Sequence, residues 1–188
     1  FYIFYTAYDG VTPRVAVAVT DDFESYTKLG VIPTLVGDKD AFIFPERINN
    51  KIAYIHRIEP DIQIDYFDSI EDLFDKDYWQ NYEPHEKILL KGIHKWENIK
   101  IGGGVPPIRT DEGWLFIYHG VSDDRTPFCY RVGAALLDLE NPSIVLSRLS
   151  KPLLEPTEGY ERYGDVNEVV FPQGAYMKSN WLYISYGA

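Results

Sequence analysis

The chain has 188 residues, of which 45% are hydrophobic, so it can bury a substantial core and is neither disordered nor of low complexity. Its formal net charge of −11 argues against nucleic acid and anionic membrane surfaces as partners, because both are bound through basic faces. The single cysteine, Cys129, excludes an internal disulfide and favours a reducing compartment, so we expect a cytoplasmic protein.

Four segments rich in aromatic and β-branched residues share one pattern, and each predicts a strand. They cover residues 1–7, 51–57, 113–119 and 180–186. Because the copies begin at positions 1, 51, 113 and 180, the repeat period is 50 to 67 residues. A period of this size suits one blade of a β-propeller with insertions.

Further strands are predicted on both sides of these copies. A proline-bearing strand is predicted before each of the last three copies, at residues 42–45, 105–107 and 169–172. Turn residues between each such strand and its copy predict hairpins. Apolar strands are predicted after the first three copies, at residues 14–21, 61–65 and 130–138. Between the second and third copies, residues 68–79 are predicted to form a short helix.

Groups of strands that recur with this period indicate an all-β fold, in which residues 1–188 form a partial β-propeller of three to four blades. A β-sandwich is the alternative, but its turns would recur about every 8–12 residues without a longer period. Phe1 lies inside one predicted strand and Ala188 directly follows another. We therefore expect an incomplete internal fragment that lacks N- and C-terminal parts, with open strand edges that would allow a homo-oligomer.

Two side chains that can carry positive charge occupy equivalent positions in the repeat. Arg57 and His119 each lie 12 residues after the marked proline of their copy, Pro45 and Pro107 respectively. Equivalent positions on the early strands of propeller blades face one central region, so these side chains are expected to converge. An unpaired arginine in an apolar strand would be costly, whereas a histidine there is also compatible with a plain core role.

Two lysines stand just before proline-bearing strands. Lys39 precedes the first of these strands and Lys100 the second, followed by three glycines at residues 102–104. With Arg57 and His119 they would form one basic pocket in an acidic protein. Such a pocket suits a phosphate dianion, because charge-assisted bonds from arginine and lysine are strong. A lone lysine is also compatible with a solvated face, and the remaining histidines show no metal-ligand spacing, so no metal site is predicted.

Short motifs follow one another in a fixed order along essentially the whole chain. They include Phe-Pro-Glu at residues 44–46, His-Arg at 56–57 and Gly-Trp-Leu-Phe-Ile-Tyr-His at 113–119. The full set occupies residues 5–10, 13–16, 43–46, 56–57, 96–97, 100–102, 113–121, 133–138, 152–156, 169–172 and 186–188. Each string is weak alone, but the ordered set specifically resembles glycoside hydrolase family 130, which contains β-mannoside phosphorylases and β-mannosidases.

The resemblance implies a five-bladed β-propeller that cleaves β-mannosides with inorganic phosphate and releases mannose 1-phosphate with inverted configuration. Phosphate would be a co-substrate, and no cofactor is implied. The residues implied to hold phosphate are Arg57, Lys100, His119 and Lys39. The residues implied to contact the mannoside are Tyr8, Asp9 and Glu168. Family hydrolases lack the intact basic set, so the resemblance favours phosphorolysis.

The proton donor of the family is an aspartate in a Glu-Asp-Pro-Arg motif, which is expected upstream of Phe1. A further sugar-binding aspartate is expected beyond Ala188. The resemblance therefore assigns no catalytic residue within this chain. Isolated residues 1–188 are expected to be poorly active or inactive.

Two departures from the family pattern keep other functions open. Residues 166–168 read Val-Asn-Glu where the family often has Val-Pro-Asn, and Asp40 stands where some members have asparagine. Either Glu168 or Asp40 could act as a base that activates water, so a β-mannoside hydrolase is the first alternative. A non-catalytic propeller that binds mannosides is the second. The sequence does not distinguish β-1,2 from β-1,4 linkages.

Overall fold

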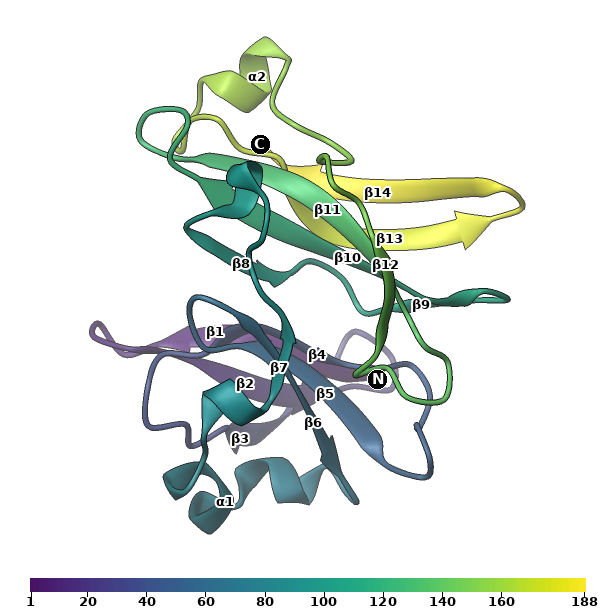
Figure 1. Cartoon of the computed structure of the whole chain (residues 1–188). Coiled ribbons are helices and arrows are strands. Elements are labelled where there is room, and N and C mark those ends of the chain that lie inside the picture. Colours follow the sequence, from purple (N-terminus) through teal and green to yellow (C-terminus); the bar gives the residue numbers. More distant parts are fainter.

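The structure, a computed structural model, describes all residues 1–188 and consists of four antiparallel β-sheets with a few short helices (Figure 1). The first sheet has the order β1-β2-β3, formed by Tyr2–Tyr8, Pro13–Val19 and Thr27–Val31. The second has the order β4-β5-β6-β7, formed by Lys39–Ile43, Ile52–Arg57, Ile62–Phe67 and Ile88–Leu90. The predicted all-β class is confirmed.

The third and fourth sheets contain the second half of the chain. The third has the order β12-β11-β10-β8, with β9 also paired to β10. Its strands, from β8 to β12, are Lys100–Gly103, Ile108–Thr110, Gly113–Ser122, Cys129–Leu137 and Val145–Arg148. The fourth is the hairpin of β13, Phe171–Lys178, and β14, Trp181–Gly187. The four repeat copies correspond to β1, β5, β10 and β14, as predicted.

The helices are single turns between strands. They are η1 (Glu71–Phe74), α1 (Lys76–Gln80), η2 (Pro84–Glu86), η3 (Lys95–Glu97) and α2 (Gly159–Arg162). The helix predicted at 68–79 is confirmed as η1 followed by α1, and Asp75 caps α1 by accepting from the backbone N–H groups of Asp77 and Tyr78. None of the helices is long and apolar enough to span a membrane.

One strand prediction is wrong. Residues 105–107 do not form a strand but connect β8 to β9. Pro106 and Pro107 have no backbone N–H and cannot donate to a neighbouring strand. The backbone N–H groups of Gly104 and Val105 both donate to the carbonyl of Ile117 instead, so the chain stays close to β10 across the break.

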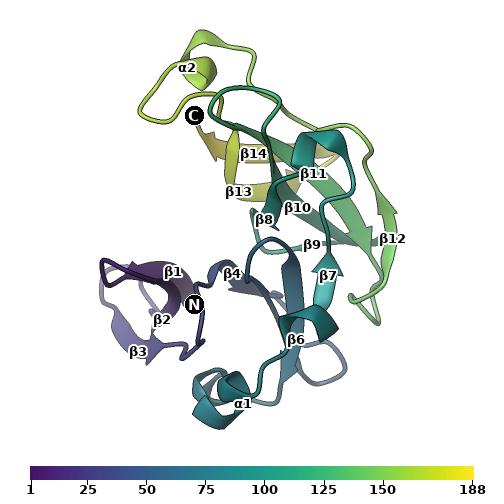
Figure 2. The same cartoon turned by 60° about the vertical axis from the view of Figure 1, so that its left-hand side comes forward.

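The four sheets follow one another along an arc (Figure 2). The first strand of each sheet lines a shared cavity of about 480 Å³, and these strands are β1, β4, β8 and β13 with the residues next to them. Neighbouring sheets touch through β1 and β4, β4 and β8, and β10 and β13. The arrangement places equivalent positions of successive sheets around one region, as the repeat predicts.

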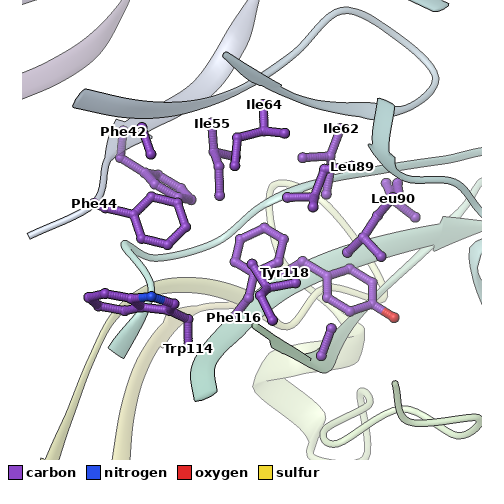
Figure 3. Close-up of a cluster of buried hydrophobic side chains, with 14 of the residues drawn as sticks. Phe42, Phe44, Ile55, Ile62, Ile64, Leu89, Leu90, Trp114, Phe116 and Tyr118 are labelled. Atoms are coloured by element: carbon purple, nitrogen blue, oxygen red, sulfur yellow. The ribbon is translucent and has the colours of Figure 1, made fainter. Parts of the chain in front are cut away.

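A large hydrophobic cluster packs the second sheet against the third (Figure 3). Phe44, just after β4, meets Trp114 on β10 in an edge-to-face contact with ring centroids 5.1 Å apart. Phe42 on β4 meets Phe116 on β10 at 6.2 Å. Burial of each such side chain contributes about 1.5–3 kcal/mol. This core fixes β4 and β5 relative to β10, and so fixes Arg57 relative to His119.

Candidate functional site

Arg57 and His119 converge on one carboxylate, that of Asp40. Arg57 Nε lies 2.9 Å from Asp40 Oδ2, and His119 Nε2 lies 3.7 Å from the same oxygen. The Arg57 and His119 side chains are each only 2% exposed. The convergence predicted from the 12-residue offset is therefore present, although Asp40 entered the sequence analysis only as a base for hydrolysis.

The strand register explains why these side chains meet. Arg57 on β5 pairs with Lys39 on β4, and His119 on β10 pairs with Gly102 on β8. A Cβ atom on Gly102 would lie 2.4 Å from His119 Cε1 and 2.5 Å from Asp40 Oδ2. Only glycine leaves room for His119 and Asp40 to approach each other across this strand.

A β-bulge places the Asp40 carboxylate. Lys39 pairs with Arg57 while Phe42 pairs with Ile55, so three steps along β4 match two along β5. Asp40 lies in the bulge with a φ of 55°, a left-handed conformation that aspartate tolerates better than most residues. Bulges redirect side chains and are common beside functional sites, and this one turns Asp40 toward Arg57 and His119.

Lys100 extends the cluster through Glu59, and Lys39 is the strand neighbour of Arg57. Glu59 Oε1 accepts from Lys100 Nζ at 2.9 Å and lies 3.2 Å from Arg57 Nη1. Lys39, Arg57 and Glu59 border a second cavity of about 450 Å³. Burial and the nearby Arg57 charge lower the pKa of Lys39. Sequence reasoning missed Glu59, although its position two residues after Arg57 puts it on the same side of an extended chain.

Several buried polar atoms at this site have no hydrogen-bond partner. They are Nε and Nη1 of Arg57, Oδ2 of Asp40 and Nδ1 of His119. Arg57 Nε is close to Asp40 but its N–H is not directed well enough for a hydrogen bond. Buried N–H groups on a permanent cation are rarely left unpaired. A bound anion with several oxygens would satisfy them.

The ionisation states follow from burial and the neighbouring charges. Burial lowers the pKa of His119 far below its usual value, and the Arg57 charge lowers it further, so the imidazole is neutral. Burial raises the pKa of Asp40, while the Arg57 and Lys39 charges limit the rise. Burial opposes ionisation of Glu59, but Lys100 and Arg57 outweigh it and lower its pKa. The site therefore combines three cationic side chains with two carboxylates and one neutral imidazole.

A second buried network lies directly behind the first and was not predicted. His56 is completely buried and contacts two aspartates, with Nδ1 at 2.9 Å from Asp38 Oδ2 and Nε2 at 3.0 Å from Asp65 Oδ2. Burial disfavours the imidazolium, but the two carboxylates outweigh burial and raise the pKa of His56 to about 9. Asp38 Oδ1 also accepts from the backbone N–H of Arg57 at 3.2 Å.

Tyrosines complete this network around Asp65. Tyr78 donates to Asp65 Oδ1 at 2.6 Å and Tyr82 donates to Asp65 Oδ2 at 2.7 Å. Burial raises the pKa of Asp65, but the His56 contact and the hydrogen bonds from Tyr78 and Tyr82 together outweigh burial and lower it. The sequence carried no usable signal for this arrangement, because its members lie 9 to 26 residues from His56 and come together only in the folded sheet.

Tyr8 is the last residue of β1 and Asp9 begins the exposed turn that follows, so both lie outside the cluster. Asp9 Oδ1 accepts from the backbone N–H groups of Val11 and Thr12, and Oδ2 pairs with Arg14 at 2.9 Å. These bonds, led by that from Thr12, lower the pKa of Asp9 to about 2. Tyr8 pairs in register with Pro13, which borders the cavity at Lys39 and Arg57, so the hairpin stands at the cavity rim.

Glu168 is held elsewhere, in the segment between α2 and β13. Its carboxylate pairs with Arg125 Nη1 at 2.5 Å and with Arg162 Nε at 3.2 Å. The bond from Arg125 and then that from Arg162 lower its pKa. The structure shows no contact between this carboxylate and the cluster around Arg57. Glu168 is therefore poorly placed to act as a base that activates water, because both of its carboxylate oxygens are already paired with arginines.

The chain matches a known protein family over its full length. The model of glycoside hydrolase family 130, described as β-1,4-mannooligosaccharide phosphorylase, matches residues 1–188. The chain is 37% identical to a 1,2-β-oligomannan phosphorylase from Thermoanaerobacter sp., over 98% of this chain and 60% of that protein. It is 33% identical to a β-1,4-mannooligosaccharide phosphorylase from Ruminococcus albus, over 87% of this chain and 48% of that protein.

A solved structure gives the same picture of the fold. The β-1,2-mannobiose phosphorylase from Listeria innocua, in complex with β-1,2-mannobiose, superposes with a TM-score of 0.84 and is 35% identical. The superposition covers 99% of this chain and 51% of that one. The chain thus spans about half to three fifths of the length of the relatives it matches.

Proposed function

The chain belongs to glycoside hydrolase family 130, and on that basis we propose that the whole protein cleaves β-mannosides by inverting phosphorolysis, releasing mannose 1-phosphate. The observation that carries the proposal is the buried guanidinium of Arg57, beside Lys39 and the Lys100–Glu59 pair. Its Nε and Nη1 atoms form ion pairs with Asp40 and Glu59 but make no hydrogen bond. Such donors suit inorganic phosphate, which needs positioning more than deprotonation to act as a nucleophile.

The arrangement of the sheets supports a propeller in which they are successive blades. The four sheets lie along an arc, and their first strands border one cavity. The last sheet has only two strands, whereas the second has four. We infer that these sheets are parts of a five-bladed propeller, with the axis at the cavity lined by β1, β4, β8 and β13.

The two cavities suggest how the reactants are arranged. Asp40 borders the axial cavity, Arg57 borders the cavity at Lys39, and the Arg57–Asp40 contact lies between them. The mannosyl group would occupy the axial cavity, while Arg57, Lys39, Lys100 and His119 hold phosphate against its anomeric carbon. Tyr8 and Asp9 at the rim would contact the sugar chain. The proton donor would come from residues outside 1–188.

Hydrolysis is the second candidate, and one observation favours it. The Asp40 carboxylate lies inside the cluster and its pKa is raised by burial, as suits a base that takes a proton from water. Phosphorolysis remains the better proposal, because a hydrolytic site has no need for three cations around the same carboxylate.

Replacement of Arg57 by alanine in the intact protein tests the proposal. Arg57→Ala removes up to two charge-assisted hydrogen bonds, each worth about 1.5–3 kcal/mol. The phosphate-dependent rate should fall at least about a hundredfold, since about 1.4 kcal/mol corresponds to a factor of ten. Arg109→Ala is a matched control, because Arg109 is exposed and lies 3.6 Å from Glu46, away from the cluster.

Products from β-1,2- and β-1,4-linked mannobiose should be measured with and without phosphate. Mannose 1-phosphate formed only with phosphate is the expected result. Free mannose formed equally fast without phosphate, and unaffected by Arg57→Ala, would show that the protein is a hydrolase. If neither product forms while mannobiose still binds, the protein is a non-catalytic mannoside-binding propeller.

A further inference from the structure

A negative side chain in the middle of an anion pocket needs an explanation. Asp40 Oδ2 lies 2.9 Å from Arg57 Nε and 3.7 Å from His119 Nε2, and the oxygen is buried without a hydrogen bond. An ionised carboxylate repels any anion that binds beside it. If the pocket served only to gather positive charge, an amide or hydroxyl at this position would serve it better.

The backbone conformation directs the Asp40 side chain toward this place. Asp40 occupies the bulge of β4 with a φ of 55°, a conformation that costs free energy for most residues. Gly102 opposite has no side chain and leaves room for it. Behind the bulge, Asp38 is anchored by His56 and by the backbone N–H of Arg57. These contacts fix the backbone from which the Asp40 side chain projects.

The groups that face Asp40 come from four strands. Arg57 and Lys39 are cations on β5 and β4, and Lys100 on β8 is a third. Asp38 is a further negative charge that acts on Asp40, and His119 on β10 is neutral. The pocket therefore offers many donors, and the Asp40 carboxylate supplies acceptor oxygens among them.

We propose, building on the phosphorolytic function above, that Asp40 makes the pocket select an oxyanion that still carries a proton. The P–OH group of inorganic phosphate would donate a hydrogen bond to Asp40, while Arg57 and the lysines donate to the other oxygens. Arsenate carries a proton in the same pH range and fits equally. Sulfate carries none, so one of its oxygens would face the carboxylate lone pairs without a hydrogen atom between them.

A plain counter-ion role for Asp40 makes a different prediction. If Asp40 only neutralises Arg57, it weakens phosphate and sulfate binding alike, and the ratio of their affinities does not depend on it. If it accepts a hydrogen bond from the ligand, the ratio depends on it directly. A binding site discriminates strongly against an analogue that leaves a buried polar group unpaired.

The test is the binding of phosphate, arsenate and sulfate to the intact protein by titration calorimetry at pH 7.5. In the wild type, sulfate should bind at least about tenfold more weakly than phosphate or arsenate, because one charge-assisted hydrogen bond is replaced by a repulsive contact. Asp40→Asn should bring the ratio close to one, because the amide can donate to sulfate. Asparagine also tolerates a left-handed φ, so the bulge should persist.

Glu46→Gln is the matched control, because Glu46 is an exposed carboxylate paired with Arg109 at 3.6 Å. It removes the same charge from the protein and should leave the ratio unchanged. Equal binding of sulfate and phosphate to the wild type, or an unchanged ratio in Asp40→Asn, would overturn the role of Asp40 alone. A wild type that binds none of the three anions would overturn the phosphate pocket, and the role of Asp40 with it.

Discussion

The buried network of His56 makes the stability of the protein depend on pH in a defined window. His56 contacts Asp38 and Asp65 at 2.9 and 3.0 Å, and no part of its side chain is exposed. Its pKa is about 9 in the folded protein, against 6.5 for an ordinary histidine. Since the folded value is the higher one, the stabilisation is complete below about pH 6.5 and is lost as pH rises toward 9.

The size of the effect follows from the two pKa values. A difference of one pH unit corresponds to about 1.4 kcal/mol, so a rise from 6.5 to about 9 contributes about 3 kcal/mol to the free energy of unfolding. This is a substantial part of the 5–15 kcal/mol or so that keeps a typical domain folded. The Asp65 pKa is lowered, so that carboxylate contributes only on the acid side and does not affect this window.

Urea unfolding of the intact protein at pH 6.5, 7.5 and 9 measures the loss. Asp65→Asn removes one of the two carboxylates that hold the proton on His56, so its stability should fall less over the same range. Asp68→Asn is the control, because Asp68 is exposed and pairs with Lys51 on the surface. The proposed role of the His56 network is refuted if the wild type and Asp65→Asn lose the same free energy of unfolding between pH 6.5 and 9. It is also refuted if the His56 ring titrates near pH 6.5 by NMR.

Two further substitutions test one residue inside the cluster around Arg57 and one residue outside it. Gly102→Ala should destabilise the protein by about 1–3 kcal/mol and raise the KM for phosphate, because a Cβ atom would lie within 2.5 Å of His119 and Asp40; an unchanged melting temperature with an unchanged KM would contradict this. Glu168→Gln should change the phosphate-dependent rate less than about tenfold, because Glu168 is engaged by Arg125 and Arg162. A loss as large as that expected for Arg57→Ala would show that Glu168 takes part in the reaction.

Most of the fold prediction rested on the repeat of aromatic-rich strand segments. An apolar, aromatic-rich strand is recognisable from local residue types, because strand propensity and alternation act over a few residues. The four repeat copies therefore proved to be strands β1, β5, β10 and β14. The segment 105–107 was misassigned because the repeat suggested a strand, whereas two consecutive prolines prevent pairing there.

Only part of the candidate site could be predicted from the sequence repeat. Arg57 and His119 could be paired because the repeat places them at equivalent positions, and the structure shows them on one carboxylate. The positions of Asp38 and Glu59 beside these side chains could not be predicted, because nothing local distinguishes a paired carboxylate from the many solvated ones. Their partners lie 18 and 41 residues away in the chain.

The sequence by itself determined the strand content, the repeat and the basic residues that the resemblance to the family assigns to phosphate. Only the tertiary structure decided which side chains are desolvated and what faces them. The β4 bulge directs Asp40 at Arg57, Gly102 admits His119, and His56 holds its proton between two aspartates. Burial and charge proximity are properties of distance in space, and electrostatic energies depend steeply on both, so residue order alone does not contain them.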